Sequence, residues 1–181
     1  RAQLYTERGL PTRQAAVDAL VGVAHNFAPK TGTVGNDYEN DTEYIDKRAV
    51  LRYKSAEAYV LNEKLLAKAE LTDFEKAWSD ELSGALGRMP DYTKTTYRTL
   101  VFDHAGEEAY NSFINKLDTS MELGVPVIFD NFTSTTKTID GYPIDGDKKV
   151  FLHVDGIHGK DLRAYLHGVD DAEGEVLFNK G

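Results

Sequence analysis

The chain of 181 residues is long enough for one domain with a hydrophobic core, and its hydrophobic fraction of 41% and charged fraction of 28% are those of a globular protein. The formal net charge of -9 argues against nucleic acid or an anionic membrane as the main partner, because binding to phosphates requires clustered Lys and Arg, and it favours cationic protein partners. The absence of cysteine excludes disulfides, thiolate metal ligands and cysteine nucleophiles.

Helical patterns fill the first half of the chain. The spacing of apolar residues predicts a helix over residues 13–27, followed by a polar loop rich in Gly and Asn over 29–43. A second helical region is predicted over 46–69, with an interruption near Lys54 and Ser55.

A third helix has signals at both of its ends. Thr72 and Glu75 have the spacing of a capping box, in which the hydroxyl and the carboxylate each accept a hydrogen bond from a backbone N–H that the helix leaves unpaired. The apolar residues that follow recur on one helical face. Gly87 and Pro90 are predicted to end this helix.

The composition shifts near residue 90 to short runs of β-branched and aromatic residues, which are typical of strands. One helix is expected in this part, over 107–123, and Gly124 closes it. The residues predicted to face inward from that helix are Tyr110, Phe113, Ile114, Leu117 and Met121. The predicted strands span 97–102, 126–129, 132–136, 149–154 and 174–178, and a further short helix spans 159–166.

Helices followed by strands predict an α+β fold. We expect one domain over residues 1–181, with a mainly helical part over 1–90 and a β-rich part over 91–181 that contains the functional residues. No internal repeat divides the sequence further.

Three short segments of the β-rich part contain polar side chains that could serve in catalysis or ligand binding: YRTL at 97–100, FTSTT at 132–136 and EGEVLF at 173–178. Each segment also has an ordinary structural interpretation. An Arg in a strand usually forms a surface ion pair, and a run of Ser and Thr is favourable in many strands.

The Glu-x-Glu of the last segment is the most informative of these features. Because side chains alternate along a strand, Glu173 and Glu175 are predicted to face the same way. Two carboxylates on one face repel each other unless a cation or a reacting group lies between them. A solvated acidic edge is the alternative interpretation.

Taken in order, the three segments resemble the Arg-Ser-Glu class of mono-ADP-ribosyltransferases, which includes the enzymatic components of clostridial binary toxins and several bacterial and phage effectors. That class has an aromatic-Arg pair on a first strand, then a Ser-Thr-Ser run after an aromatic residue, and finally Glu-x-Glu. The matching residues here are Tyr97, Arg98, Phe132, Ser134, Thr135, Thr136, Glu173 and Glu175. Thr136 replaces the usual third Ser. Upstream, RYKSAEAYVLNEKLL (52–66) and LSGALGRMPDYTKTTYRTL (82–100) are similar to the class's helical lead-in and its approach to the first strand.

The resemblance implies NAD as a substrate and gives the matching residues roles that suit their chemistry. Arg98 is expected to hold the pyrophosphate, because a guanidinium bonds phosphate oxygens in pairs. Glu175 is expected to stabilise the positive charge that develops on the ribose as nicotinamide leaves, and Ser134 to fix Glu175 by a hydrogen bond. Glu173 is expected to orient the acceptor and take up its proton.

Three further residues are assigned by the same resemblance. The backbone at Thr99, where many members have Gly, is expected to hold the nicotinamide amide, and Thr135 is expected to contact NAD. Residues 163–171 correspond to the segment that reads the target protein, and Tyr165 is its aromatic candidate, with packing on the core as the equal alternative. Because Glu at position 173 accompanies arginine modification in this class, an accessible arginine of a target protein is the expected acceptor.

The resemblance also implies a fold of two packed, roughly perpendicular β-sheets with N-terminal helices, and NAD in the cleft between the sheets. The expected activity is transfer of ADP-ribose from NAD to a protein. The enzyme would be a toxin, an effector or a phage-delivered protein that acts in the cytosol of a target cell after secretion or virion delivery. Two alternatives stay open: NAD glycohydrolysis, in which water is the acceptor, and a catalytically inactive NAD-binding interaction module.

Neither a membrane segment nor a metal site is expected. The sequence has no run of about 18 apolar residues and its first residues lack the apolar core of a signal peptide, so we expect a soluble domain excised from a longer precursor. The five histidines show no zinc-ligand pattern.

Overall fold

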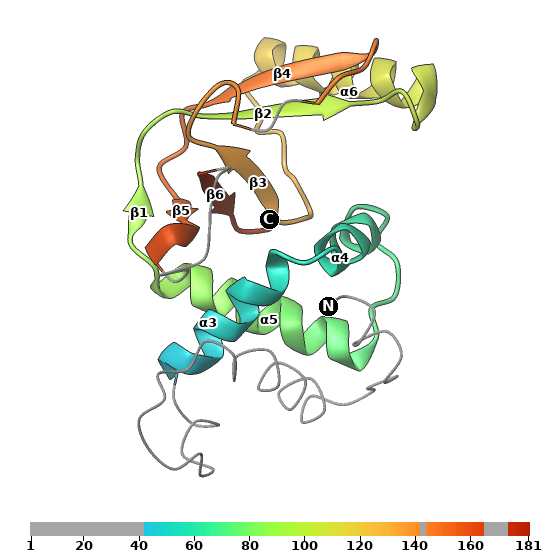
Figure 1. The fold of residues 1–181 in the computed structure, drawn as a ribbon. Helices are drawn as coiled ribbons and strands as arrows, with labels where there is room; N and C mark the ends of the chain where they lie inside the picture. The colour runs from blue at the N-terminus through green and yellow to red at the C-terminus, as the bar shows by residue number, and fades with distance from the viewer. Residues whose placement is uncertain (1–41, 142–143, 165–173) are drawn as a thin grey trace, which may run out of the picture. The chain divides into compact units, whose positions relative to one another are not determined.

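A computed structural model of the chain describes residues 42–141, 144–164 and 174–181 (Figure 1). The described residues divide into two compact units, one helical and one β-rich, with a boundary between Met89 and Pro90, and Ala164 is also assigned to the helical unit. This boundary coincides with the composition shift near residue 90. That the whole chain forms one domain stays a prediction.

The described residues of the helical unit form three helices: α3 (Thr42–Tyr53), α4 (Glu57–Leu66) and α5 (Asp73–Arg88). The predicted interruption of the second helical region is confirmed. α3 ends at Tyr53, and the Ser55 hydroxyl accepts a hydrogen bond at 3.3 Å from the backbone N–H of Glu57, where α4 begins. The helix expected over 13–27 and most of the loop expected over 29–43 lie outside the described residues.

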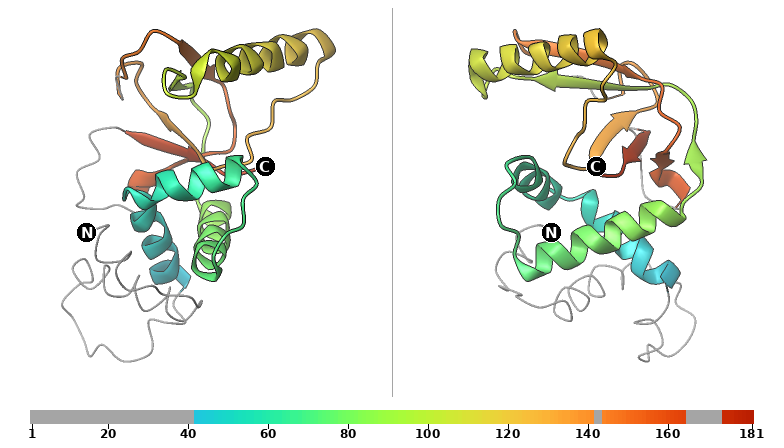
Figure 2. Two further views of the ribbon diagram at one scale, coloured as in Figure 1. Left: turned by 90° about the vertical axis from the view of Figure 1, so that its right-hand side faces the viewer. Right: turned by 180° about the vertical axis from the view of Figure 1, so that it is seen from behind.

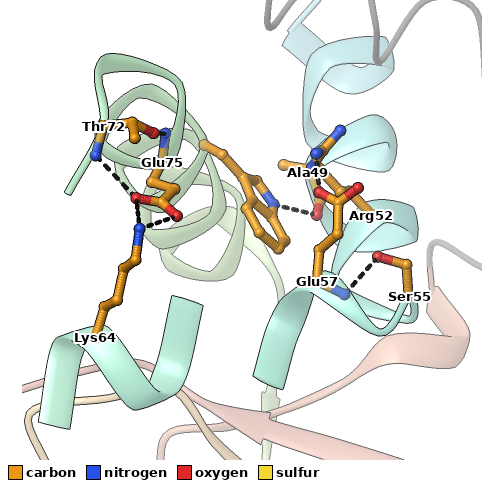
Figure 3. Close-up of polar contacts among 8 residues, drawn as sticks. Ala49, Arg52, Ser55, Glu57, Lys64, Thr72 and Glu75 are labelled. Carbon is orange, nitrogen blue, oxygen red and sulfur yellow. Dashed lines mark hydrogen bonds and ion pairs between the residues drawn. The ribbon is translucent and has the colours of Figure 1, made fainter. Parts of the chain in front are cut away.

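The helices pack around Trp78, whose side chain is 1% exposed. Its indole N–H donates to the backbone oxygen of Ala49 at 3.1 Å, which joins α5 to α3 where the two helices cross (Figures 2 and 3). The guanidinium carbon of Arg52 lies 5.0 Å from the centre of the Trp78 ring, and the guanidinium forms an ion pair with Glu57. This buried cation therefore has both an aromatic face and a carboxylate to compensate for the loss of water.

The capping box at the start of α5 is confirmed. The Thr72 hydroxyl accepts from Glu75 N at 3.2 Å, and the Glu75 carboxylate accepts from Thr72 N at 2.8 Å (Figure 3). Lys64 of α4 donates to both oxygens of the same carboxylate, at 2.7 and 2.9 Å. Burial by itself would raise the pKa of Glu75, but the bonds from Lys64 and Thr72 outweigh it and hold this pKa below its usual value.

The described part of the β-rich unit has six strands: β1 (Asp91–Tyr92), β2 (Thr96–Val101), β3 (Thr133–Thr136), β4 (Lys149–Val154), β5 (Gly159–Asp161) and β6 (Glu175–Phe178). They form one sheet in the order β1-β5-β6-β3-β2-β4, and neighbouring strands are antiparallel.

A single residue pair joins the two halves of this sheet. β2 pairs with β4 over six residues and β3 pairs with β6 over four, but β2 meets β3 only at Tyr97 and Thr136. The strands diverge from that point, so β2 and β4 run in a different direction from β3 and β6 (Figure 1). Among the described strands, the two expected sheets are therefore two parts of one bent sheet.

Helix α6 (Gly106–Leu123) runs along β2 and β4 (Figures 1 and 2). Phe102, just after β2, contacts Tyr110 and Phe113 of this helix, with ring centres 5.7 and 5.4 Å apart. Gly124 ends α6 with a φ of 64°, a left-handed conformation that glycine adopts without strain. The predicted inward position is confirmed for Tyr110 and Phe113 but is wrong for Met121, which lies in the last turn, beyond these aromatic contacts, and is 76% exposed.

Two expected elements differ from the structure. Residues 126–129 form no strand, and Pro126 has no N–H to donate to a ladder. Of the short helix expected over 159–166, residues 159–161 form β5, which pairs with β6, and Leu162–Ala164 form one 3₁₀ turn, while residues 165 and 166 lie outside the described residues. In both places the secondary structure depends on whether a partner strand is available, as it is for β5 and is not for residues 126–129, and the local sequence pattern does not encode this.

Glu75 makes the stability of the helical unit depend on pH. A carboxylate whose pKa is lowered by folding stabilises the folded state above its unfolded pKa, and this contribution is lost as the pH falls through the lowered value. We expect the free energy of unfolding to decrease as the pH falls below 4.5, the ordinary Glu value, and to decrease less in Glu75→Gln and Lys64→Met variants. Fluorescence of Trp78, the single tryptophan, reports this unfolding.

The matched control is Lys76→Met, which removes an exposed lysine of α5 and should retain the full pH dependence. The role assigned to Glu75 is wrong if wild type and all variants lose stability equally in acid.

Candidate active site

Ser134 lies between Arg98 and Glu175 and contacts both. Its hydroxyl donates to the Glu175 carboxylate at 2.7 Å, and its backbone oxygen accepts from the Arg98 guanidinium at 2.5 Å. The structure thus brings together three of the residues that the sequence selected. The backbone contact could not have been predicted from residue types, because every residue has a carbonyl oxygen.

Strand register explains this geometry. Thr136 of β3 is opposite Glu175 of β6, and Ser134 is on the same face of β3 as Thr136 because side chains alternate. Ser134 is therefore a diagonal neighbour of Glu175 across the two strands. At the other edge of β3, the pairing of Tyr97 with Thr136 brings the next residue of β2, Arg98, to the same place.

The Glu175 side chain is enclosed by this arrangement. Glu175 is 4% exposed, whereas Arg98 and Ser134 are half-buried. A buried carboxylate is costly unless hydrogen-bond donors face it, and the Ser134 hydroxyl is such a donor. The acid is thereby held in a defined orientation, which is what electrostatic stabilisation of a developing positive charge requires.

The two threonines that follow in β3 use their hydroxyls within the sheet. Thr135 is 1% exposed and donates to the backbone oxygen of Val176 at 2.8 Å. The Thr136 hydroxyl lies 2.8 Å from the backbone oxygen of Thr138 and 3.3 Å from that of Tyr97, so it can donate to either. These contacts hold β3 against its neighbours, and contact between Thr135 and NAD stays a prediction.

The backbone of Thr99 is directed away from β4. Phe102 N donates to Lys148 O at 2.9 Å, so these two residues form a hydrogen-bonded pair of the antiparallel β2–β4 ladder. Such pairs alternate along the ladder, so every second residue of β2 before Phe102 also exchanges hydrogen bonds with β4. The residues between them direct their backbone N–H and C=O to the opposite edge of β2. Thr99 is one of the latter. Because β3 meets that edge only at Tyr97, the described strands supply no ladder partner there for Thr99.

Glu173 and Tyr165 lie outside the described residues, so their roles stay predictions. The structure does show what separates Glu173 from Glu175. β6 begins at Glu175, and Gly174 has a φ of 57°, in the left-handed region that favours glycine. The strand alternation that predicted a shared face for the two acids therefore does not extend across Gly174.

Within the part of the chain that the structure describes, no group of three His, Asp or Glu side chains has an arrangement that could hold a metal ion. That the site works without a metal stays a prediction. None of the described helices is both long and apolar enough to cross a membrane.

Comparison with known proteins bears on the fold. No protein-family model and no curated protein sequence matches the chain. Among solved structures, Exoenzyme S from Pseudomonas aeruginosa, in complex with human 14-3-3 protein beta and bound to Carba-NAD, is similar to this chain with a TM-score of 0.54 and 19% sequence identity. The similarity covers 93% of this chain and 76% of that one.

The expected fold class is confirmed by this likeness. The chain has an α+β, ADP-ribosyltransferase-like fold in which helices precede an antiparallel sheet. At 19% identity the likeness shows the fold alone. An assignment of activity has to come from the site itself.

The buried hydrogen bond of Thr135 can be tested apart from any activity. Thr135→Val removes the donor to Val176 O, and we expect the free energy of unfolding to fall by about 1–3 kcal/mol in denaturation followed by circular dichroism. Thr133→Val is the matched control in the same strand, because the Thr133 hydroxyl is 3.5 Å from its acceptor, Asn131 O. An equal or smaller loss for Thr135→Val than for the control would contradict the assignment.

Proposed function

We propose that this chain binds NAD and transfers its ADP-ribose to an arginine of a target protein, with nicotinamide as the leaving group. The observation that carries the proposal is the chain of contacts from Arg98 through Ser134 to Glu175. A guanidinium for the pyrophosphate and a fixed carboxylate for a developing cation are two groups that this reaction needs. The fold likeness to Exoenzyme S, whose matched structure is bound to Carba-NAD, supports the same proposal.

In the first step, the bond between the nicotinamide nitrogen and the ribose carbon breaks, and nicotinamide leaves with the electron pair. Arg98 holds the pyrophosphate, and Glu175 stabilises the positive charge that develops on the ribose. Ser134 keeps that carboxylate in one orientation. Because the negative charge interacts more strongly with the charged transition state than with the bound substrate, it lowers the barrier.

The backbone of Thr99 holds the amide of nicotinamide. It presents an N–H and a C=O at the edge of β2 that faces away from β4, and an amide offers the matching acceptor and donor. The side chain of Thr99 alternates to the opposite face from Arg98, so the replacement of Gly by Thr leaves the Arg98 face open. Thr135 supports the NAD site by holding β3 against β6.

In the second step, a guanidinium nitrogen of the target attacks the ribose carbon and loses a proton to Glu173. Tyr165 contacts the target protein. The net charge of -9 suits a target with a cationic surface around the modified arginine. As a toxin, effector or phage-delivered enzyme, the protein reaches the cytosol of a target cell after secretion or virion delivery.

NAD glycohydrolysis is the second candidate, because Arg98, Ser134 and Glu175 serve the step that both reactions share. Incubation with NAD labelled in its adenylate part and a cell lysate separates the two. A labelled protein band with an ADP-ribose increment on arginine supports transfer, whereas free ADP-ribose without labelled protein indicates glycohydrolysis. Absence of any NAD cleavage would refute both and favour an inactive NAD-binding interaction module.

Replacing Glu175 by Gln keeps the size of the side chain and removes its negative charge. We expect NAD cleavage, measured as nicotinamide release, to fall by about 10²–10³-fold, because the charge acts on the transition state. The affinity for NAD, measured by calorimetry, should be kept. Glu122→Gln, an exposed change near the end of α6, is the control. Glu175 has no catalytic role if its variant cleaves NAD at the wild-type rate.

A further inference from the structure

Glu175 is the first residue of β6, and residues at the end of an element open more readily than those in its middle. The role proposed for Glu175 requires a carboxylate in a fixed position. The hydrogen bond from Ser134 orients the carboxylate but cannot fix it if the backbone that carries it moves. The start of β6 therefore needs contacts of its own.

Lys137, the first residue after β3, holds the start of β6 from one side. Its backbone N–H donates to Gly174 O at 3.1 Å, one residue beyond the pairing of Thr136 with Glu175. This bond closes the β3–β6 ladder immediately before Glu175. The aliphatic part of the Lys137 side chain also passes Gly174, because a Cβ placed on this glycine would lie 3.5 Å from Lys137 Cδ and 3.6 Å from Lys137 Cβ, which are distances of ordinary contact.

The Lys137 ammonium reaches the strand on the other side of β6. In the sheet, β6 lies between β3 and β5, and the ammonium forms an ion pair at 2.7 Å with Asp161, the last residue of β5. The second carboxylate oxygen of Asp161 accepts from Arg163 N at 3.1 Å, which orients this acid. The Lys137–Asp161 pair, which we call the strap, therefore connects the two neighbours of β6 across its start.

The strap lies on the face of the sheet opposite to the Glu175 carboxylate. Asp161 and Thr135 are both opposite Val176, so these three side chains share one face. Lys137 shares this face with Thr135, because side chains alternate along a strand, and its ion pair with Asp161 agrees with this. Glu175 directly precedes Val176 and points to the other face. Lys137 thus contacts the backbone next to Glu175 without sharing the face of its carboxylate.

The strap is more enclosed than an ordinary surface ion pair. The side chains of Lys137 and Asp161 are 20% and 34% exposed, whereas those of the Lys149–Asp145 pair are 44% and 104% exposed. Water and salt screen an enclosed pair less than an exposed one. The ring of Tyr92, with its centre 5.8 Å from the Lys137 ammonium, adds an aromatic face to this position. A pair of this kind can hold two strands in place.

We propose that Lys137 is a positioning residue for Glu175. The inference rests on the proposed function, in which the Glu175 carboxylate stabilises the charge that develops on the ribose. By joining β3 to β5 across the start of β6, Lys137 fixes the backbone from which that carboxylate extends, while Ser134 fixes the carboxylate itself. Loss of the strap lets the start of β6 move, and NAD cleavage slows because the carboxylate is displaced from the developing charge.

The test compares Lys137→Met, Lys137→Arg and Asp161→Asn in the full chain, and Lys137→Met also in combination with Glu175→Gln. Three quantities are measured: kcat and KM for nicotinamide release, the affinity for NAD by calorimetry, and hydrogen exchange of the backbone amides over residues 174–178. Lys149→Met is the matched control, since it breaks the exposed pair with Asp145.

We expect Lys137→Met and Asp161→Asn to lower kcat by about tenfold and to keep the affinity for NAD, because a misplaced charge acts less on the transition state than on nothing else in the bound complex. Amide exchange over 174–178 should become faster in both variants. Lys137→Arg keeps the positive charge and should restore kcat, and Lys149→Met should match wild type.

The combined variant decides whether Lys137 acts through Glu175. Lys137→Met together with Glu175→Gln should cleave NAD no more slowly than Glu175→Gln alone, since there is no longer a charge to position.

A tenfold loss that persists in the Glu175→Gln background would overturn the inference, because the effect would not pass through that carboxylate. Wild-type kcat in both strap variants would overturn it as well, and so would slower cleavage with unchanged amide exchange. An equal loss of kcat and NAD affinity would show general damage to the site and has the same consequence. A wild type that cleaves no NAD refutes the proposed function, whereas any of the other outcomes with an active wild type refutes the role of Lys137 alone.

Discussion

The register of β3 against β6 is the constraint on which the site depends. With Thr136 opposite Glu175, the Ser134 hydroxyl reaches the carboxylate, and a shift by one residue would turn Ser134 to the other face of the sheet. Val176 and Leu177, which point to opposite faces of β6, are both 0% exposed, so packing on both faces of this strand holds its register against β3. The geometry of the proposed site is therefore a consequence of core packing in two four-residue strands.

The bend of the sheet is the second constraint. If β2 paired with β3 along its whole length, the backbone of Thr99 would be used in a ladder and could not bind a ligand. Because the pairing of β2 with β3 is limited to Tyr97 and Thr136, Arg98 lies beside Ser134, and the part of β2 that follows Arg98 diverges from β3. One sheet thereby supplies a guanidinium, a fixed acid and a strand edge without a ladder partner among the described strands.

Local signals in the sequence predicted much of this fold. The capping box of Thr72 and Glu75, the interruption near Ser55 and the closure of α6 at Gly124 depend on neighbours within a few residues, and all three are confirmed. The short strands β1 and β5 could not be predicted in the same way, because two or three residues have no useful periodicity and are strands only through their pairing. The pairing of Arg98 with a backbone oxygen and of Lys137 with Asp161 likewise depends on residues that only the folded sheet brings together.

The central claim is that Arg98, Ser134 and Glu175 form one site that cleaves NAD. The most direct measurement is the rate of nicotinamide release from NAD by the wild type and by Ser134→Ala, with Ser112→Ala on the exposed face of α6 as the control. The account predicts release by the wild type and by the control, and a rate about 10²-fold lower for Ser134→Ala, because Glu175 loses the donor that orients it. No release by the wild type, or equal rates for Ser134→Ala and the wild type, would contradict it.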